Sequence, residues 1–259
     1  PTLTYDAAFV AAKAGMQSKQ TAPVADLIKY AASLKKSETG KLFGELADYY
    51  LEVDLYTEAG DILKQGAEEA SQAYELGGKT DIALQMLAEA RKSIPDHPLL
   101  IYQEGWVYAH AGRYEDAIAQ FEKAIQKAEE LGMSSLIRSS RLNLSNAYVQ
   151  KGDMKKGEEI LEIILKESPD DPSVNNDLGY LYADQGKNLE QAEQMITKAI
   201  QAEPDNGAYL DSMGWILHKR GKHQEALEYL IKSSEKSQTG SDATIWDHLG
   251  DVYHALNRA

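Results

Sequence analysis

Histidine and the carboxylates are the side chains that could bind a metal ion or transfer protons here, because the chain contains no cysteine. None of the six histidines lies four residues from another, and no His-Glu-x-x-His pattern occurs. His218 and His254 take equivalent places in two successive sequence repeats, so they could approach each other. We interpret both as polar helix residues and predict no metal site.

Motifs for phosphate binding and nucleophilic catalysis are missing as well. The segment Gly77-Gly78-Lys79-Thr80 superficially resembles the end of a phosphate-binding loop, but Ala73 stands where the first glycine would lie. We therefore predict a helix end, followed by Thr80 as the N-cap of the next helix. No serine lies in a Gly-x-Ser-x-Gly turn, and carboxylates are too frequent for any pair to stand out. The sequence predicts no catalytic residue, no cofactor and no enzymatic activity.

The 259-residue chain carries a formal net charge of −14. Such an acidic surface repels nucleic-acid phosphates and anionic lipids, so we expect no nucleic-acid partner. No stretch approaches the roughly 20 apolar residues that cross a bilayer, so we expect no direct membrane insertion. The charge favours a protein or peptide ligand that is neutral or basic. The sequence does not determine the cellular compartment, which is either the cytoplasm or, if a signal segment was removed, the periplasm.

The elements that position these side chains are predicted to be helices. Good helix formers are plentiful, and only seven prolines interrupt them. No run of alternating β-branched residues bounded by turn residues indicates a strand. An all-α fold follows, and the 43% of hydrophobic residues is enough for a sizeable core.

One four-residue frame recurs along the chain. Gly179-Tyr180-Leu181-Tyr182 returns as Gly214-Trp215-Ile216-Leu217 and as Gly250-Asp251-Val252-Tyr253, at glycine spacings of 35 and 36 residues. Toward the N-terminus, the frame returns as Ser145-Asn146-Ala147-Tyr148, 34 residues earlier, and as Gly105-Trp106-Val107-Tyr108, a further 40 residues earlier. A spacing near 34 residues is typical of stacked helical hairpins.

A second signature follows each of the first four frames. It consists of a glycine, a small residue and a large apolar residue: Gly112, Ala117 and Phe121; Gly152, Gly157 and Leu161; Gly186, Ala192 and Ile196; Gly221, Ala226 and Leu230. The glycine lies where the first helix must end and the chain must turn. The small residue lets the second helix approach the bulky residues of the first, and we expect Pro169 and Pro204 to close a repeat and to begin the next helix.

These residues resemble the tetratricopeptide repeat, most clearly from Pro98 to Ala259, and segments such as Asn176-Asp177-Leu178-Gly179-Tyr180 look like those of bacterial repeat proteins. The resemblance implies an all-α, right-handed α-solenoid of stacked antiparallel helix pairs. It places repeats at about 98–137, 138–171, 172–206 and 207–242, with a half repeat at 243–259. Residues 1–97 are then a region of divergent helices of the same type.

Two irregularities interrupt this pattern. Frames through Ala59 and Ala83 are only 24 residues apart, so we expect one long helix from Thr57 to Leu76 shared between them. The repeat that begins at Pro98 has extra residues, which should lengthen the helices around Gly132. The half repeat at 243–259 ends after its first helix, so we expect that the natural chain continues or that a neighbour covers this end.

In the resembling family, the first helices line a concave face that binds ligands. The positions that project there carry Tyr102, Trp106, Asn146, Gln150, Asn176, Tyr180, Asp184, Asp211, Trp215, His218, Asp247 and Asp251. The resemblance implies a groove for an extended peptide, with aromatic contact area, asparagines on the backbone and aspartates that select basic residues. The alternative for Trp106, Tyr180 and Trp215 is that they pack between neighbouring repeats as core.

The leading hypothesis is therefore a scaffold for protein–protein interaction. A second hypothesis is a regulatory or assembly repeat region of a larger enzyme or of a secretion or envelope protein, which the half repeat suggests. The sequence also leaves open self-association through the C-terminal end. The basic residues that clamp an acidic chaperone tail in some relatives are missing, so we expect no such ligand.

Overall fold

The computed structural model divides the chain into two compact units, an N-terminal unit (Pro1–Lys151) and a C-terminal unit (Gly152–Ala259). It describes residues 4–17, 21–35, 74–93, 95–236 and 243–257, together with residues 42, 46, 67, 71 and 72. Each unit has its own helices.

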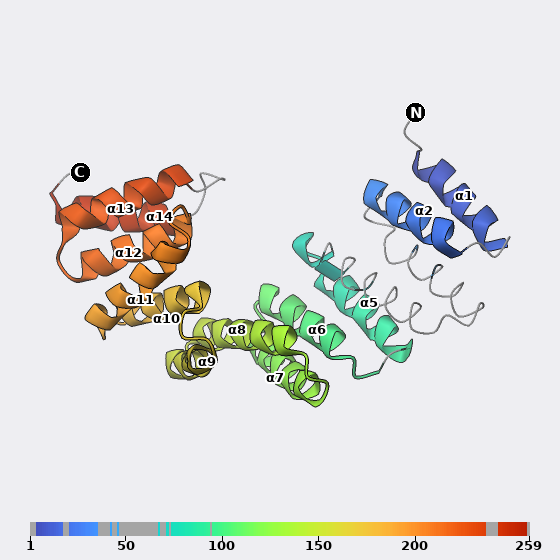
Figure 1. The fold of residues 1–259 in the computed structure, drawn as a ribbon, viewed down its shortest axis with the longest axis horizontal. Helices are drawn as coiled ribbons and strands as arrows, with labels where there is room; N and C mark the ends of the chain where they lie inside the picture. The colour runs from blue at the N-terminus through green and yellow to red at the C-terminus, as the bar shows by residue number, and fades with distance from the viewer. Residues whose placement is uncertain are drawn as a thin grey trace. The chain divides into compact units, whose positions relative to one another are not determined.

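The N-terminal unit is built from antiparallel helices that contact their neighbours in the chain (Figure 1). These are α1 (Tyr5–Gln17), α2 (Thr21–Leu34), α5 (Thr80–Ser93), α6 (Pro98–His110), α7 (Tyr114–Glu130) and α8 (Ser134–Lys151). Leu42 and Leu46 are buried in one apolar cluster with α1 and α2, and α5 and α6 share a second cluster. The long helix expected at Thr57–Leu76 falls almost wholly outside the described residues.

The C-terminal unit continues the same pattern. Its helices are α9 (Met154–Glu167), α10 (Pro172–Asp184), α11 (Leu189–Ala202), α12 (Gly207–Lys219), α13 (His223–Lys236) and α14 (Ala243–Ala255). The described part of the chain contains no strand, and its helices pack in pairs. The expected all-α fold of stacked helix pairs is confirmed. We call the first helix of each repeat (α6, α8, α10, α12, α14) an A helix and the second (α7, α9, α11, α13) a B helix.

Local chemistry sets the ends of these helices. Asp153, Asp171 and Asn206 each cap an N-terminus, because their side-chain oxygens accept backbone N–H groups of the first turn. The glycines predicted to end the A helices, at positions 112, 152, 186 and 221, all have positive φ, a region that favours glycine.

Two predicted boundaries need correction. Thr80 is the first residue of α5 rather than the capping residue before it, although Gly78 does end the preceding helix at a φ of 69°. Pro169 and Pro204 lie in turns, whereas Pro98 and Pro172 are the prolines that begin helices. The helices on either side of Gly132 are long, as expected, with 17 residues in α7 and 18 in α8.

Close contact at glycine holds three of the A helices, α6, α10 and α12, to their B helices. A Cβ on Gly105 would lie 2.8 Å from the Phe121 ring, and one on Gly179 would lie 2.9 Å from Ile196. In the next pair, a Cβ on Gly214 would lie 2.5 Å from Leu230. No real Cβ tolerates such distances, so the small-into-large packing that the repeat pattern predicts is confirmed.

Among the described residues, no helix is long and apolar enough to span a membrane. The division into residues 1–97 and 98–259 stays a prediction.

Candidate functional site

The A helices of the C-terminal unit carry eight of the residues predicted to contact a ligand. These are Asn176, Tyr180 and Asp184 on α10, Asp211, Trp215 and His218 on α12, and Asp247 and Asp251 on α14. Helix α12 contacts both α10 and α14, so the three helices form a row (Figure 1). Stacking of successive repeats therefore brings these side chains onto neighbouring helices.

A histidine from α14 joins this row at its centre. Nδ1 of His248 lies 3.0 and 3.1 Å from the two carboxylate oxygens of Asp211, and both residues are buried. The His248 ring also stacks on Trp215, with centroids 4.1 Å apart, and lies 6.2 Å from the Tyr180 ring. A proton on Nδ1 lets His248 donate to the carboxylate, so Asp211 is engaged within the protein.

A second histidine and a lysine also lie against Trp215. His218 stacks with it at 5.3 Å and lies 4.9 Å from the His223 ring, while Lys219 Nζ lies 4.4 Å from the Trp215 ring centroid. Burial lowers the pKa of His218, and the neighbouring His223 lowers it further, although Asp251 acts in the opposite direction. His218 is therefore mainly neutral near pH 7. Lys219 shows that the indole face accepts a cation.

Several buried polar atoms in this row and at the start of the neighbouring α13 have no hydrogen-bond partner among the described residues. They are Asn176 Oδ1, Trp215 Nε1, His218 Nδ1 and His223 Nδ1. The amide nitrogen of Asn176 does donate, to Asp177 Oδ1 at 3.2 Å. Buried polar atoms are nearly always hydrogen-bonded, so an acceptor and several ring nitrogens left unpaired on adjacent helices need an explanation.

Carboxylates line the exposed edge of the row. Asp184, Asp247 and Asp251 are exposed, and the last two lie four residues apart, so they share one face of α14. Exposed aspartates on the A helices give this surface a negative charge.

The N-terminal unit carries the other four predicted residues. Tyr102 and Trp106 are half-buried on α6, whereas Asn146 and Gln150 are exposed on α8, which contacts α6. The Tyr102 hydroxyl accepts a hydrogen bond from Asn143 at 3.1 Å. The Trp106 ring is tilted against the His110 ring, with centroids 3.7 Å apart, and it packs against the apolar cluster of this unit. The structure thus brings these four residues onto two contacting helices.

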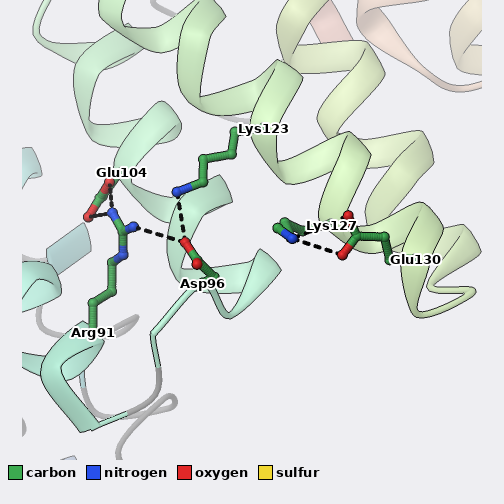
Figure 2. Close-up of polar contacts among 6 residues, drawn as sticks. All are labelled: Arg91, Asp96, Glu104, Lys123, Lys127 and Glu130. Carbon is green, nitrogen blue, oxygen red and sulfur yellow. Dashed lines mark hydrogen bonds and ion pairs between the residues drawn. The ribbon is translucent and has the colours of Figure 1, made fainter.

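An ion-pair network fixes α6 in place (Figure 2). Arg91 of α5 donates from Nη1 to both carboxylate oxygens of the buried Glu104 of α6, at 2.8 Å each. Its Nη2 lies 3.6 Å from Asp96, which also accepts a 2.8 Å hydrogen bond from Lys123 of α7. The Lys123 hydrogen bond lowers the pKa of Asp96. Arg91 and Asp96 thereby connect α6, which carries Tyr102 and Trp106, to α5 and α7.

The sequence-based site omitted His248, the residue that organises the row. Its only sequence signal is that it follows Asp247, a predicted surface residue, by one position. The described residues contain no group of three or more histidine and carboxylate side chains that could hold a metal ion. His218 instead contacts Trp215 and His223, and His254 is exposed.

Fold and site together define a helical-hairpin repeat protein. Models of the tetratricopeptide repeat match residues 98–131 and residues 148–216. The chain therefore contains tetratricopeptide repeats, which form a scaffold for protein–protein interaction.

Known relatives are distant. A photosystem I assembly protein Ycf3 from Prochlorococcus marinus is 28% identical over 93 residues, which are 36% of this chain and 51% of that protein. The chain thus spans about half the length of this relative. Two solved structures share the fold. A tetratricopeptide repeat protein from Parabacteroides merdae is 17% identical at a TM-score of 0.58, with 96% of this chain and 98% of that one covered. MamA from Desulfovibrio magneticus is 23% identical at a TM-score of 0.54, with 68% and 97% covered.

Proposed function

We propose that the C-terminal unit binds an extended segment of a partner protein across α10, α12 and α14. The observation that carries the proposal is the pair of unpaired buried atoms on contacting helices, Asn176 Oδ1 and Trp215 Nε1. One accepts a hydrogen bond and the other donates one, as the N–H and C=O groups of a peptide backbone require. Lys219 is exposed, so its side chain can move away from the Trp215 ring and uncover the ring for a ligand.

The charges select the kind of peptide. Asp184, Asp247 and Asp251 are exposed and available to lysine or arginine residues of a ligand, whereas Asp211 is engaged by His248. A ligand cation can also take the position of Lys219 over the Trp215 ring. The proposed ligand is therefore neutral or basic, and binding should weaken as salt rises because exposed charges are screened.

The N-terminal unit offers a second, separate surface of the same kind. Tyr102 and Trp106 supply half-buried aromatic area, and Asn146 and Gln150 supply exposed amide groups. We propose that this surface also contacts a partner. The proposal assigns binding to both surfaces and no catalysis, metal or cofactor to either.

A peptide array tests the charge and the hydrogen bonds separately. The full chain is applied to immobilised random peptides enriched in lysine and arginine, and to matched peptides enriched in aspartate and glutamate. We expect selective capture of basic peptides, at least a fivefold weaker signal for the pair Asp247→Asn and Asp251→Asn, and a weaker signal for Trp215→Phe.

The matched control is the pair Glu225→Gln and Glu228→Gln, which removes the same charge from exposed positions on the B helix α13. It should retain capture. Equal losses in the two double variants would mean that net charge alone attracts the peptides. Preference for acidic peptides would overturn the proposal.

An assembly region of a larger protein complex is the alternative. The relative from Prochlorococcus marinus is named an assembly protein, and this gives the alternative some support. A competition experiment distinguishes the two functions. A partner that is captured as a folded complex, and that an array-selected peptide fails to displace, favours the assembly function.

A further inference from the structure

Three of the chain's six histidines gather at Trp215. His218 stacks on the indole from the same helix, and His248 stacks on it from α14. His223, the first residue of α13, lies against the His218 ring. The ordinary pKa of histidine falls within the range of about pH 5 to 8, so the centre of the proposed peptide surface can change its charge under mild conditions.

The pair formed by His218 and His223 differs from His248 in its hydrogen bonds. The Nδ1 atom of His248 is engaged by Asp211. The Nδ1 atoms of His218 and His223 are buried and have no hydrogen-bond partner among the described residues, and the two ring centroids are 4.9 Å apart. A neutral imidazole accepts a hydrogen bond at one ring nitrogen, whereas an imidazolium accepts none. The pair can therefore accept a ligand N–H only while it is neutral.

Burial and neighbouring charges decide the protonation of His218. Burial lowers its pKa, and His223 of α13 lowers it further. Lys219 of α12 and His248 of α14 act in the same direction, whereas Asp251 of α14 raises it. A proton on one ring of the pair disfavours a proton on the other, because the rings are adjacent. His218 is therefore neutral near pH 7 and takes up a proton in more acidic solution than an ordinary histidine does.

Helices α10 and α11 also pack against α12, and their carboxylates are placed differently. Glu193 of α11 forms ion pairs with Arg220 and Lys222, which lie in the turn between α12 and α13. Asp184 of α10 is exposed. The ordinary pKa of aspartate and glutamate lies near 4, so the charge that changes between about pH 5 and 8 belongs to histidine.

We propose that the pair of His218 and His223 makes the peptide surface release its ligand in mildly acidic solution. The inference rests on the proposed function, in which a basic segment lies across Trp215. While the pair is neutral, it offers acceptors and leaves the indole to a ligand cation in place of Lys219. Once protonated, His218 places a positive charge on the same indole and near Asp251, so a ligand lysine or arginine is repelled where it was attracted.

Tryptophan fluorescence tests the protonation without a ligand. A variant with Trp106→Phe and Trp246→Phe keeps Trp215 as the single tryptophan, and a protonated imidazole in contact with an indole quenches its fluorescence. Acidification from about pH 8 to 5 should quench Trp215 with a midpoint below the ordinary histidine pKa. Adding His218→Gln should remove most of this quenching. Equal quenching with and without His218 would assign the titration to His248 and overturn the proposal.

The same titration tests whether the two rings act as a pair. His223→Gln should move the quenching midpoint to higher pH, because it removes a group that lowers the pKa of His218. An unmoved midpoint would show that the rings are not coupled and would overturn the role of the pair.

Ligand binding tests the consequence. The probe is a labelled lysine-rich peptide selected on the array, which is titrated with the full chain by fluorescence anisotropy at about pH 7.5 and about pH 5.5. We expect at least fivefold weaker binding at the lower pH for the wild type, and affinities within about twofold at the two pH values for His218→Gln. The matched control is His110→Gln, which removes a histidine that lies against Trp106 in the N-terminal unit and should keep the wild-type pH dependence.

The outcomes separate this inference from the function on which it rests. No peptide binding at either pH overturns both. Equal binding by the wild type at both pH values, or the same acid weakening in the wild type and in His218→Gln, overturns the pH dependence alone. Circular dichroism should show the same helix content at both pH values. A loss of helix at the lower pH would make release a result of unfolding and would also overturn the proposal.

Discussion

Gly214 in α12 and Gly250 in α14 are the same residue at the same place in the repeat, yet their surroundings are opposite. A Cβ on Gly214 would lie 2.5 Å from Leu230, while one on Gly250 would have no described neighbour within 4 Å. The repeat pattern therefore specifies which face of an A helix can be approached. Whether that face is covered depends on which helices pack beside the A helix.

The same contrast extends to other equivalent positions. Asp211 of α12 is buried and paired with His248, whereas Asp247, at the same place in α14, is exposed. Tyr182 of α10 is buried and donates to Glu162 at 3.2 Å, whereas its equivalent Tyr253 is exposed. Covered positions serve the packing of the array, and uncovered positions face solvent.

Overpacking a covered contact should have the largest effect. Ala192 is fully buried on α11, and its carbonyl oxygen lies 3.2 Å from where a Gly179 Cβ would be. Ala192→Leu should force α10 and α11 apart and lower the free energy of unfolding by about 1–3 kcal/mol. Urea unfolding measures this change, and an unchanged midpoint would mean that another face of α11 packs on α10.

Unfolding at alkaline pH should distinguish the buried Tyr182 from the exposed Tyr253. Burial, together with the nearby Glu162 carboxylate, raises the pKa of Tyr182 to about 12. Below pH 10 the hydroxyl is protonated in both the folded and the unfolded chain. Between about pH 10 and 12 only the folded chain keeps this proton, so the stability that it contributes is lost as pH rises, by roughly 2 kcal/mol.

Tyr182→Phe should remove this part of the alkaline loss, and Tyr253→Phe should not. Urea unfolding at pH 9 and pH 11.5 compares the two variants with the wild type. An equally steep loss in wild type and Tyr182→Phe would contradict the effect of burial on this hydroxyl.

Alanine at the two equivalent glycines should give the smallest effects on stability, and the two effects should be opposite in sign. Gly214→Ala places a methyl group against Leu230 and should lower stability by about 1–2 kcal/mol. Gly250→Ala meets no described neighbour and should raise stability by about 0.5–1 kcal/mol, because alanine is the better helix former. Thermal or urea unfolding of the two variants gives the comparison directly, and a shift in the same direction for both would break it.

Much of the fold was predictable because its signals are local. The positive-φ glycines at 112, 152, 186 and 221 follow their frames by seven residues, and the close contacts at Gly105, Gly179 and Gly214 follow from residue size. The hydrogen bond between Asp211 and His248 was not predictable. It depends on how α12 and α14 align side by side, which neither helix encodes alone.

The candidate site was predictable only as a set of positions. Repeat spacing brings Tyr180, Trp215 and Asp251 onto successive A helices, but these side chains differ in how far they are buried. Trp215 is 8% exposed and Asp251 is exposed, because each A helix covers part of the one before it. Which of these residues meet a ligand stays a prediction.

The lengths of α7 and α8 offer an experimental handle. With 17 and 18 residues against 13 in α6, they extend about one helical turn further, and Leu131 at their junction is 64% exposed. Since the chain contains no cysteine, a single cysteine introduced at position 131 gives one unique attachment point for a fluorophore or spin label. Such a label would report on the N-terminal unit from a loop that carries none of the proposed contact residues.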